Sequence, residues 1–142
     1  MPKMTGSGLQ FAAMPLRLRQ DGSLEVALVT TRETRRWIIP KGWPMKGRKP
    51  WQVAALEARQ EAGLLGTVER KPLGSFSYFK RREGAFEVCD VMVFVLWVTG
   101  QKERFRERAE RSVLWVSIEE AIIAVDEPGL KQVLALAIQK VA

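Results

Sequence analysis

Glu57 and Glu61 are the two residues whose type and spacing point most directly to chemistry. Because they stand four positions apart, a helix would project both carboxylates from one face. Neither has a Lys or Arg three or four positions away, so their repulsion is not relieved within the helix. A hard divalent cation such as Mg²⁺ accepts ligands of this kind and shares them with substrate phosphates. The alternative is a solvated pair, or one that binds basic residues from elsewhere in the fold.

Basic residues are numerous in the chain. It has 23 Lys and Arg residues against 16 Asp and Glu, a formal charge of +7, which favours anionic partners or simply keeps the protein in solution. We expect Arg32, Arg36 and Lys41 to bind phosphate, because arginine grips phosphate oxygens in pairs and lysine supplies a mobile charge. We interpret a second basic group, residues 80–82, as a solvated turn.

Trp43 follows Gly42 in the basic loop before the pair. Its aromatic face could stack on a base or cover a ligand, and core packing is an equally good interpretation. The other tryptophans fall within strand or helix patterns and are interpreted as core residues: Trp37, Trp51, Trp97 and Trp115.

The composition excludes several kinds of site. The chain has no histidine, which rules out histidine bases and imidazole zinc sites. Cys89 is its single cysteine, so no intrachain disulfide forms, and we interpret this residue as a small buried side chain. The longest apolar stretch, Val91 to Val98, is too short to cross a bilayer. The polar start of the chain does not resemble a secretion signal, and we predict a cytoplasmic location.

A helix over residues 51–62 must carry the glutamate pair. Apolar residues recur there at helical spacing, Pro50 suits the first helical position and Gly63 suits the end. The apolar stripe consists of Trp51, Ala54, Ala55, Ala58 and Ala62. Four of the five are alanine, so this helix can lie very close to whatever it covers.

Alternating and apolar segments on both sides of this helix predict a β-sheet. The predicted strands are residues 9–18, 24–31, 36–39, 66–71, 74–79, 86–98 and 112–116. Pro40-Lys41-Gly42 ends the third of them, and the long valine-rich strand should be central. Ser117 and Glu120 match a capping box for a short helix, which a last amphipathic helix follows. We therefore predict an α+β fold, with a mixed sheet packed between helices, as one domain over residues 9–142 after a flexible tail of residues 1–8.

The residues around the pair match part of a known motif. Gly42, Glu57, Glu61, Gly63 and Leu64 resemble the Nudix hydrolase family, in which a glycine, a loop, a helix with several glutamates and a closing glycine-aliphatic pair form a loop-helix-loop metal site. Four positions depart from the family pattern: Arg48, Leu56, Ala58 and Gln60.

Two of these departures affect the implied metal site. Gln60 stands where a third helix carboxylate is usual and offers a neutral carbonyl oxygen. Leu56 replaces an arginine that, in the family, helps to orient the glutamates. The resemblance thus implies Mg²⁺, with Mn²⁺ as a substitute, held by Glu57, Glu61 and Gln60.

The family often supplies one further carboxylate from outside the helix. Glu103, Glu107 and Glu110 lie in the polar segment where such a residue is expected. We predict that Glu110 serves as this ligand or base, so that Glu57, Glu61 and Glu110 are the catalytic residues.

The segment Arg36 to Gly47 resembles a bacterial branch similar to diphosphoinositol polyphosphate phosphohydrolases, which also carries a basic residue at the position of Arg48. This resemblance implies hydrolysis of a phosphoanhydride bond in a diphosphoinositol polyphosphate or dinucleoside polyphosphate. The residues expected to bind the substrate are Arg32, Arg36, Lys41, Gly42 and Trp43.

Two other functions stay open. In one, the altered motif leaves a domain that binds a nucleotide or polyphosphate without cleaving it. In the other, the protein is an RNA-end pyrophosphohydrolase. We rank nucleic acid below a small anionic polyphosphate, because the positive charge gathers near the motif rather than along a track. The sequence does not predict the oligomeric state.

Overall fold

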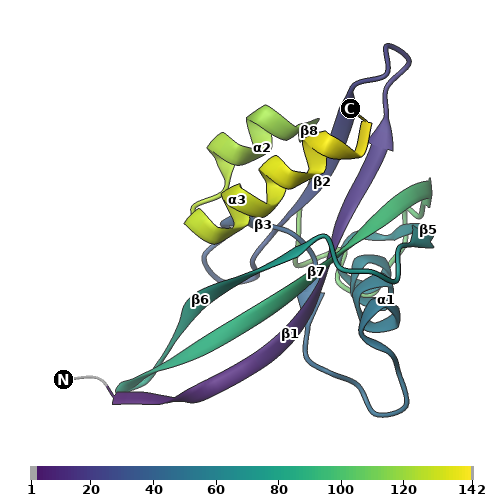
Figure 1. Ribbon diagram of the computed structural model, residues 1–142. Helices are drawn as coiled ribbons and strands as arrows, with labels where there is room; N and C mark the ends of the chain where they lie inside the picture. The colour runs from purple at the N-terminus through teal and green to yellow at the C-terminus, as the bar shows by residue number, and fades with distance from the viewer. Residues whose placement is uncertain (1–2, 142) are drawn as a thin grey trace.

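The computed structural model describes residues 3–141, apart from the side chains of residues 3–7 and Arg82. Within this range eight strands form one mixed sheet with helices packed against it, which confirms the predicted α+β fold (Figure 1). The strands are β1 (Lys3–Leu18), β2 (Leu24–Thr30), β3 (Trp37–Ile38), β4 (Lys41–Gly42), β5 (Leu64–Val68), β6 (Gly74–Arg82), β7 (Ala85–Gln101) and β8 (Val113–Ser117). The helices are α1 (Pro50–Ala62), α2 (Ile118–Ala124), α3 (Pro128–Ala137) and the short 3₁₀ helix η1 (Ile138–Val141).

β7 is the central strand, as predicted. Along one edge it pairs in parallel with β1, and its other edge is divided between β6 and β5, which are both antiparallel to it. The outer edge of β1 is divided in the same way between β4 and β2. The short β4 therefore carries Lys41 and Gly42 to the middle of β1.

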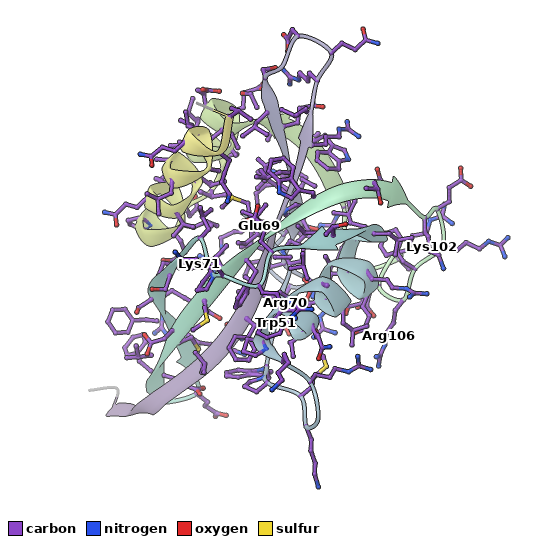
Figure 2. All side chains as sticks on the ribbon, turned by 45° about the vertical axis from the view of Figure 1, so that its right-hand side comes forward. Trp51, Glu69, Arg70, Lys71, Lys102 and Arg106 are labelled. Carbon is purple, nitrogen blue, oxygen red and sulfur yellow. The ribbon has the colours of Figure 1, made fainter. Side chains whose placement is uncertain are left out.

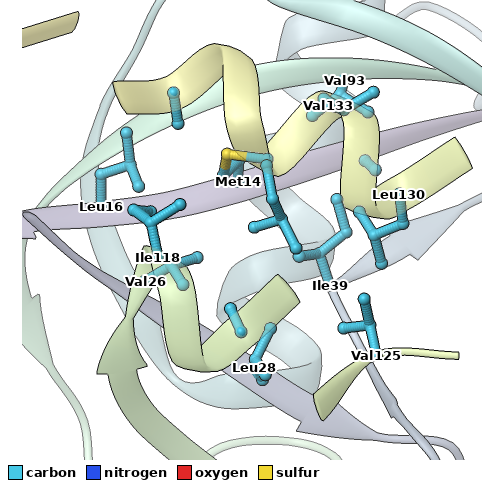
Figure 3. Packing of buried hydrophobic residues seen from close by; sticks show 14 of the residues in the cluster. Met14, Leu16, Val26, Leu28, Ile39, Val93, Ile118, Val125, Leu130 and Val133 are labelled. Atoms are coloured by element: carbon cyan, nitrogen blue, oxygen red, sulfur yellow. The ribbon is translucent and has the colours of Figure 1, made fainter. Parts of the chain in front are cut away.

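Two hydrophobic cores lie on opposite faces of the sheet, and β1 contributes to both. Ala12, Met14 and Leu16 pack with α2 and α3 in the cluster that Figure 3 shows. Phe11 and Ala13 pack with α1. Successive side chains of a strand point to opposite faces, so one short segment can supply both cores.

The buried face of α1 is rich in alanine, as predicted. Ala54, Ala58 and Ala62 are fully buried, and their small side chains let the helix lie close to the sheet. Gly63 ends the helix with a φ of 71°, which is the expected glycine conformation at this position. Trp51 stands at the start of the helix beside Arg70, whose guanidinium carbon lies 5.6 Å from the centre of the ring (Figure 2).

The structure differs from the sequence-based expectations at several strand ends. Residues 1–2 of the predicted flexible tail lie outside the described residues, but residues 3–8 extend β1 and pair with β7. The hydrogen bonds of a β-ladder join backbone atoms, so a polar, glycine-bearing segment can form them. The third strand ends before Pro40, as predicted, but Lys41 and Gly42 also form β4, which was not predicted. The predicted strands 66–71 and 86–98 begin earlier, at Leu64 and Ala85, and they end at Val68 and Gln101.

Other local expectations are confirmed. At the start of α2, Glu120 N donates to Ser117 Oγ at 3.1 Å, and Ser117 N donates to Glu120 Oε1 at 2.9 Å. Cys89 is fully buried, and the four tryptophans assigned to the core are partly buried against the two clusters. Among residues 3–141, no helix is both long enough and apolar enough to span a membrane.

Candidate active site

Glu57 and Glu61 line one cleft, as their helical spacing predicts. Glu61 is buried, with 2% of its surface exposed, and its Oε1 has no hydrogen-bond partner among the described residues. The side chains of Glu57 and Glu61 are nevertheless close enough to share a hydrogen bond. A buried carboxylate oxygen without a partner is costly, so this atom indicates that the site is built for a ligand.

The surroundings of Glu61 oppose its negative charge. Burial and then the hydrogen bond with Glu57 raise the pKa of Glu61 to about 9, although the positive charge of Arg111 acts in the other direction. Two carboxyl groups this close do not both ionise readily without a compensating cation. The pair is therefore suited to binding positive charge.

Gly42 makes room for Glu57. A Cβ atom built on Gly42 would lie 2.7 Å from Oε1 and 2.8 Å from Cγ of Glu57. Pairing of Gly42 with Phe11 of β1 fixes its position in the sheet. This glycine is required by the close approach of a side chain, and larger residues would displace one of the two carboxylates.

Arg111 completes the site and was not identified from the sequence. Its side chain is 9% exposed, and its Nε lies 2.7 Å from Glu107 Oε1. Its Nη1 donates to the Thr30 carbonyl at 2.9 Å and lies 3.7 Å from Glu61 Oε1. The unrelieved charge of the glutamate pair was a signal that some cation was needed, but nothing in the sequence located it.

The segment between β7 and β8 reaches the site because it is fixed to the end of α1. Lys102 N donates to the Gly63 carbonyl at 2.8 Å, and Glu107 N donates to the Gln60 carbonyl at 3.0 Å. The last carbonyls of a helix lack partners within it, and this segment supplies them. Gln60, expected as a metal ligand, thus acts here through its backbone, and its side chain is not among the described residues that line the cleft.

Glu110, expected to be the additional carboxylate, lies outside the cleft. Its side chain is 54% exposed, and its Oε2 is 3.6 Å from Nη1 of Arg32. Its carbonyl accepts a hydrogen bond from Arg35. The turn after Phe105 directs Glu107 towards α1 and Glu110 towards the segment after β2, so Glu107 lines the cleft instead.

The cleft in front of the glutamate pair has a volume of about 390 Å³. Four cationic side chains line it: Arg32, Lys41, Lys80 and Arg111. Arg36, expected to bind phosphate, does not line it, and its Nε donates to Thr34 Oγ1 at 3.2 Å. The interpretation of Lys80 as part of a solvated turn was wrong, because β6 continues through this residue and presents it to the cleft.

Trp43 lines the same cleft. The residue is 39% exposed, and Lys80 Nζ lies 5.2 Å from the centre of its ring. A Cβ atom built on Gly8 would lie 2.7 Å from Cζ3 of the ring, so the tryptophan is seated against the backbone of β1. Part of the ring stays exposed and can contact a ligand.

Lys41 enters the cleft from β4 with its ammonium group bound to a neighbour. Its Nζ donates to Tyr78 Oη at 2.9 Å, and Tyr78 Oη donates to Gln10 Oε1 at 2.7 Å. Burial lowers the pKa of Lys41, while the nearby Glu61 acts in the opposite direction. Tyr78 and Gln10 lie on strands predicted from the sequence, but strand patterns alone gave no reason to single them out.

The carboxylates suit a hard divalent cation. No group of three or more acidic, Cys or His side chains within the described part of the chain could hold a metal ion by itself. Mg²⁺ needs only one or two protein carboxylates when substrate phosphates and water supply its other oxygen ligands. Glu57 and Oε1 of Glu61, which accepts no hydrogen bond from the described residues, meet that requirement.

Comparison with known proteins gives a consistent family. A family model described as NUDIX domain matches residues 9–137. The chain is 25% identical over 131 residues to Nudix hydrolase 18, mitochondrial, of Arabidopsis thaliana, covering 89% of this chain and 73% of that protein. It is 32% identical over 98 residues to Nudix hydrolase 4 of the same plant, covering 69% of this chain and 46% of that protein.

Solved structures with low sequence identity share the fold. An Ap4A hydrolase from C. elegans, in a binary complex, aligns with a TM-score of 0.68 and 19% identity over 92% of this chain and 94% of that one. The NUDIX domain of Shewanella oneidensis NrtR, complexed with ADP ribose, aligns with a TM-score of 0.68 and 15% identity over 96% of this chain and 89% of that one.

Proposed function

The chain belongs to the Nudix family, and from this premise we propose that it is a metal-dependent hydrolase that cleaves a phosphoanhydride bond in a diphosphoinositol or dinucleoside polyphosphate. The observation that supports this best is the pair of the half-buried Glu57 and the buried Glu61 in a cleft with four cations. Such substrates carry several negative charges in a row, which clustered Lys and Arg side chains can bind.

Glu57 and Glu61 would hold the divalent cation, with Mg²⁺ as the first choice and Mn²⁺ as a substitute. When bound, such a cation withdraws electron density from the phosphoryl oxygens that it contacts. Its charge would also oppose the effect of burial on Glu61, so that this carboxyl group could ionise at neutral pH.

The other residues of the cleft would hold the substrate and the attacking water. Lys41, Arg32 and Lys80 line the cleft and would bind phosphate oxygens. Glu107 replaces Glu110 as the candidate to accept a proton from water, because it lines the cleft. Arg111 contacts both Glu107 and Glu61 and would keep the two carboxylates apart and oriented.

Both substrate classes have support. The C. elegans protein of similar fold is an Ap4A hydrolase, and the NrtR domain was solved with ADP ribose, which favours a nucleotide. The exposed part of Trp43 could contact its base. The four cations favour a ligand with dense phosphate groups, such as a diphosphoinositol polyphosphate.

A domain that binds such a ligand without cleaving it is the second candidate. Leu56 and Gln60 remove a guanidinium and a carboxylate from α1, and the described residues hold no group of three acidic side chains suited to a metal. This candidate and the hydrolase differ only in turnover, so activity must be measured.

The deciding experiment is hydrolysis of a panel of diadenosine polyphosphates, diphosphoinositol polyphosphates and nucleoside triphosphates, with Mg²⁺, with Mn²⁺ and with chelator. Turnover that chelator abolishes would support the hydrolase and identify the substrate class. A compound that raises the melting temperature without being hydrolysed would support the binding domain. Hydrolysis that is unaffected by chelator would contradict the role given to the glutamate pair.

A further inference from the structure

Three strands contribute to one chain of hydrogen bonds at the wall of the cleft. Lys41 from β4 donates to Tyr78 from β6, and Tyr78 donates to Gln10 from β1. The Nζ of Lys41 also lies 4.8 Å from the centre of the tyrosine ring. The sequence separates these residues by 37 and 68 positions, so only the sheet brings them together.

The hydroxyl of Tyr78 is the hydrogen-bond partner of both Lys41 and Gln10. Gln10 is 3% exposed. Behind Lys41 and Tyr78 lies a small cavity of about 40 Å³, whose other walls are mostly apolar but include Glu127. Since a buried amide or ammonium group without a partner is costly, the hydroxyl of Tyr78 satisfies both neighbours at once.

The geometry leaves part of the ammonium group available. A lysine ammonium group has three N–H donors, and Tyr78 receives one of them. Lys41 lines the cleft beside Glu61, so its remaining donors can bind an anion there. A lysine side chain is flexible, and the bond to Tyr78 limits the directions in which it can point.

We propose that Tyr78 and Gln10 are positioning residues, which fix Lys41 so that its ammonium group binds the phosphate chain of the substrate. This inference rests on the proposed function and assigns roles to two residues that do not carry its chemistry. A phenylalanine at position 78 would fill nearly the same volume, so the part of Tyr78 that matters is its hydroxyl group.

The first test is the kinetics of Tyr78→Phe and Gln10→Met with the substrate that the panel identifies. We expect KM to rise about five- to tenfold in each, with little change in kcat, because the substrate would lose an oriented cation. Ser77→Ala is the matched control: it removes a hydroxyl from the same strand, but that hydroxyl binds Asp90 and does not line the cleft. A KM for Tyr78→Phe equal to that of Ser77→Ala would overturn the proposal.

The second test does not depend on turnover. Tyr78 is the only tyrosine in the chain, so protein labelled with 3-fluorotyrosine gives a single fluorine resonance from this ring. Lys41→Met should shift that resonance without any ligand, and Gln10→Met should shift it as well. Adding inorganic tripolyphosphate should shift it in the native sequence but not in Lys41→Met.

The two tests separate this proposal from the proposed function. If no compound is hydrolysed but the fluorine resonance responds to Lys41→Met and to tripolyphosphate, the positioning role is supported while the hydrolase is not. If the protein is active but neither Lys41→Met nor tripolyphosphate shifts the fluorine resonance, Tyr78 has no positioning role. A lower melting temperature for Tyr78→Phe with unchanged KM would likewise overturn the proposal in favour of a purely structural hydroxyl.

Discussion

At the scale of single residues, the site depends on a carboxyl group whose charged form is disfavoured by burial. Glu61 is buried beside Glu57, and one of its oxygens accepts no hydrogen bond from the described residues. Helical spacing was enough to predict that the two side chains share a face. It could not locate Arg111 or Lys80, because they come from separate strands and loops that only the tertiary fold brings to the helix.

The first prediction concerns Glu61→Gln. We expect hydrolysis to fall by about 100-fold or more, because the amide is a poorer ligand for a hard cation and carries no charge. At about pH 5 or below, where Glu61 is protonated in both states, the free energy of unfolding should change by less than about 1 kcal/mol, because glutamine has nearly the same shape as the protonated carboxyl group. Kinetics and denaturant unfolding test both statements. An undiminished rate would remove Glu61 from the mechanism.

The second prediction concerns pH in the presence of chelator. Because the pKa of Glu61 rises from 4.5 to about 9 on folding, the folded state holds this proton more tightly than the unfolded state does. The contribution of Glu61 to stability is fully present below its pKa in the unfolded state. It is lost as the pH rises through its pKa in the folded state. The melting temperature of the native sequence, relative to Glu61→Gln, should therefore fall between about pH 5 and pH 9. If the melting temperatures of the two proteins changed with pH in the same way, the pKa assigned to Glu61 would be contradicted.

At the scale of elements, the important contact is between the end of α1 and the segment from β7 to β8. Carbonyls of the last helical turn bind that segment, and the segment delivers Glu107 and Arg111 to the cleft. The sequence predicted the helix and its end because alanine spacing, Pro50 and Gly63 are local signals. It missed β4 because two residues form a strand only through their pairing with β1.

The third prediction uses Gly63→Ala. An added Cβ would lie 2.6 Å from the Lys102 carbonyl oxygen, and the positive φ of 71° already disfavours alanine. We expect a loss of about 2 to 4 kcal/mol in the free energy of unfolding, together with reduced activity, because the segment that carries Glu107 must move. Denaturant unfolding and kinetics on the same preparations measure both effects.

Gly47→Ala is the control for this prediction. Gly47 has a φ of 77° but no atom within 4 Å of an added Cβ, so it should lose only about 1 kcal/mol from backbone strain and keep its activity. Equal losses of unfolding free energy in Gly63→Ala and Gly47→Ala would mean that the clash with the segment between β7 and β8 does not contribute to the effect.

At the scale of the whole molecule, the placement of positive charge matters more than its total. The formal charge of +7 could have been spread evenly for solubility. The structure gathers Arg32, Lys41, Lys80 and Arg111 at one cleft, while Arg70, Lys71 and Lys102 lie elsewhere on the surface (Figure 2). Composition predicted an anionic ligand, but only the fold determines which Lys and Arg side chains line the cleft that would bind it.

The fourth prediction separates total from local charge. Lys80→Glu and Arg70→Glu change the net charge equally, but only Lys80 lines the cleft. We expect kcat/KM to fall about tenfold or more in Lys80→Glu and less than about threefold in Arg70→Glu, because exposed charges are screened within about 10 Å at ordinary salt. High salt should lower kcat/KM of the native sequence as well. Equal losses in the two variants would indicate that net charge alone attracts the substrate.

The way β1 serves both faces of the sheet has a consequence for how this chain can change in length. Phe11 to Leu16 alternate between two cores that differ in size and shape, the alanine-lined one with α1 and the larger one with α2 and α3. Inserting or deleting one residue there would send every following side chain to the opposite core. Substitutions in this strand should therefore be tolerated far better than single-residue insertions or deletions, which would also misplace the hairpin that leads into β2.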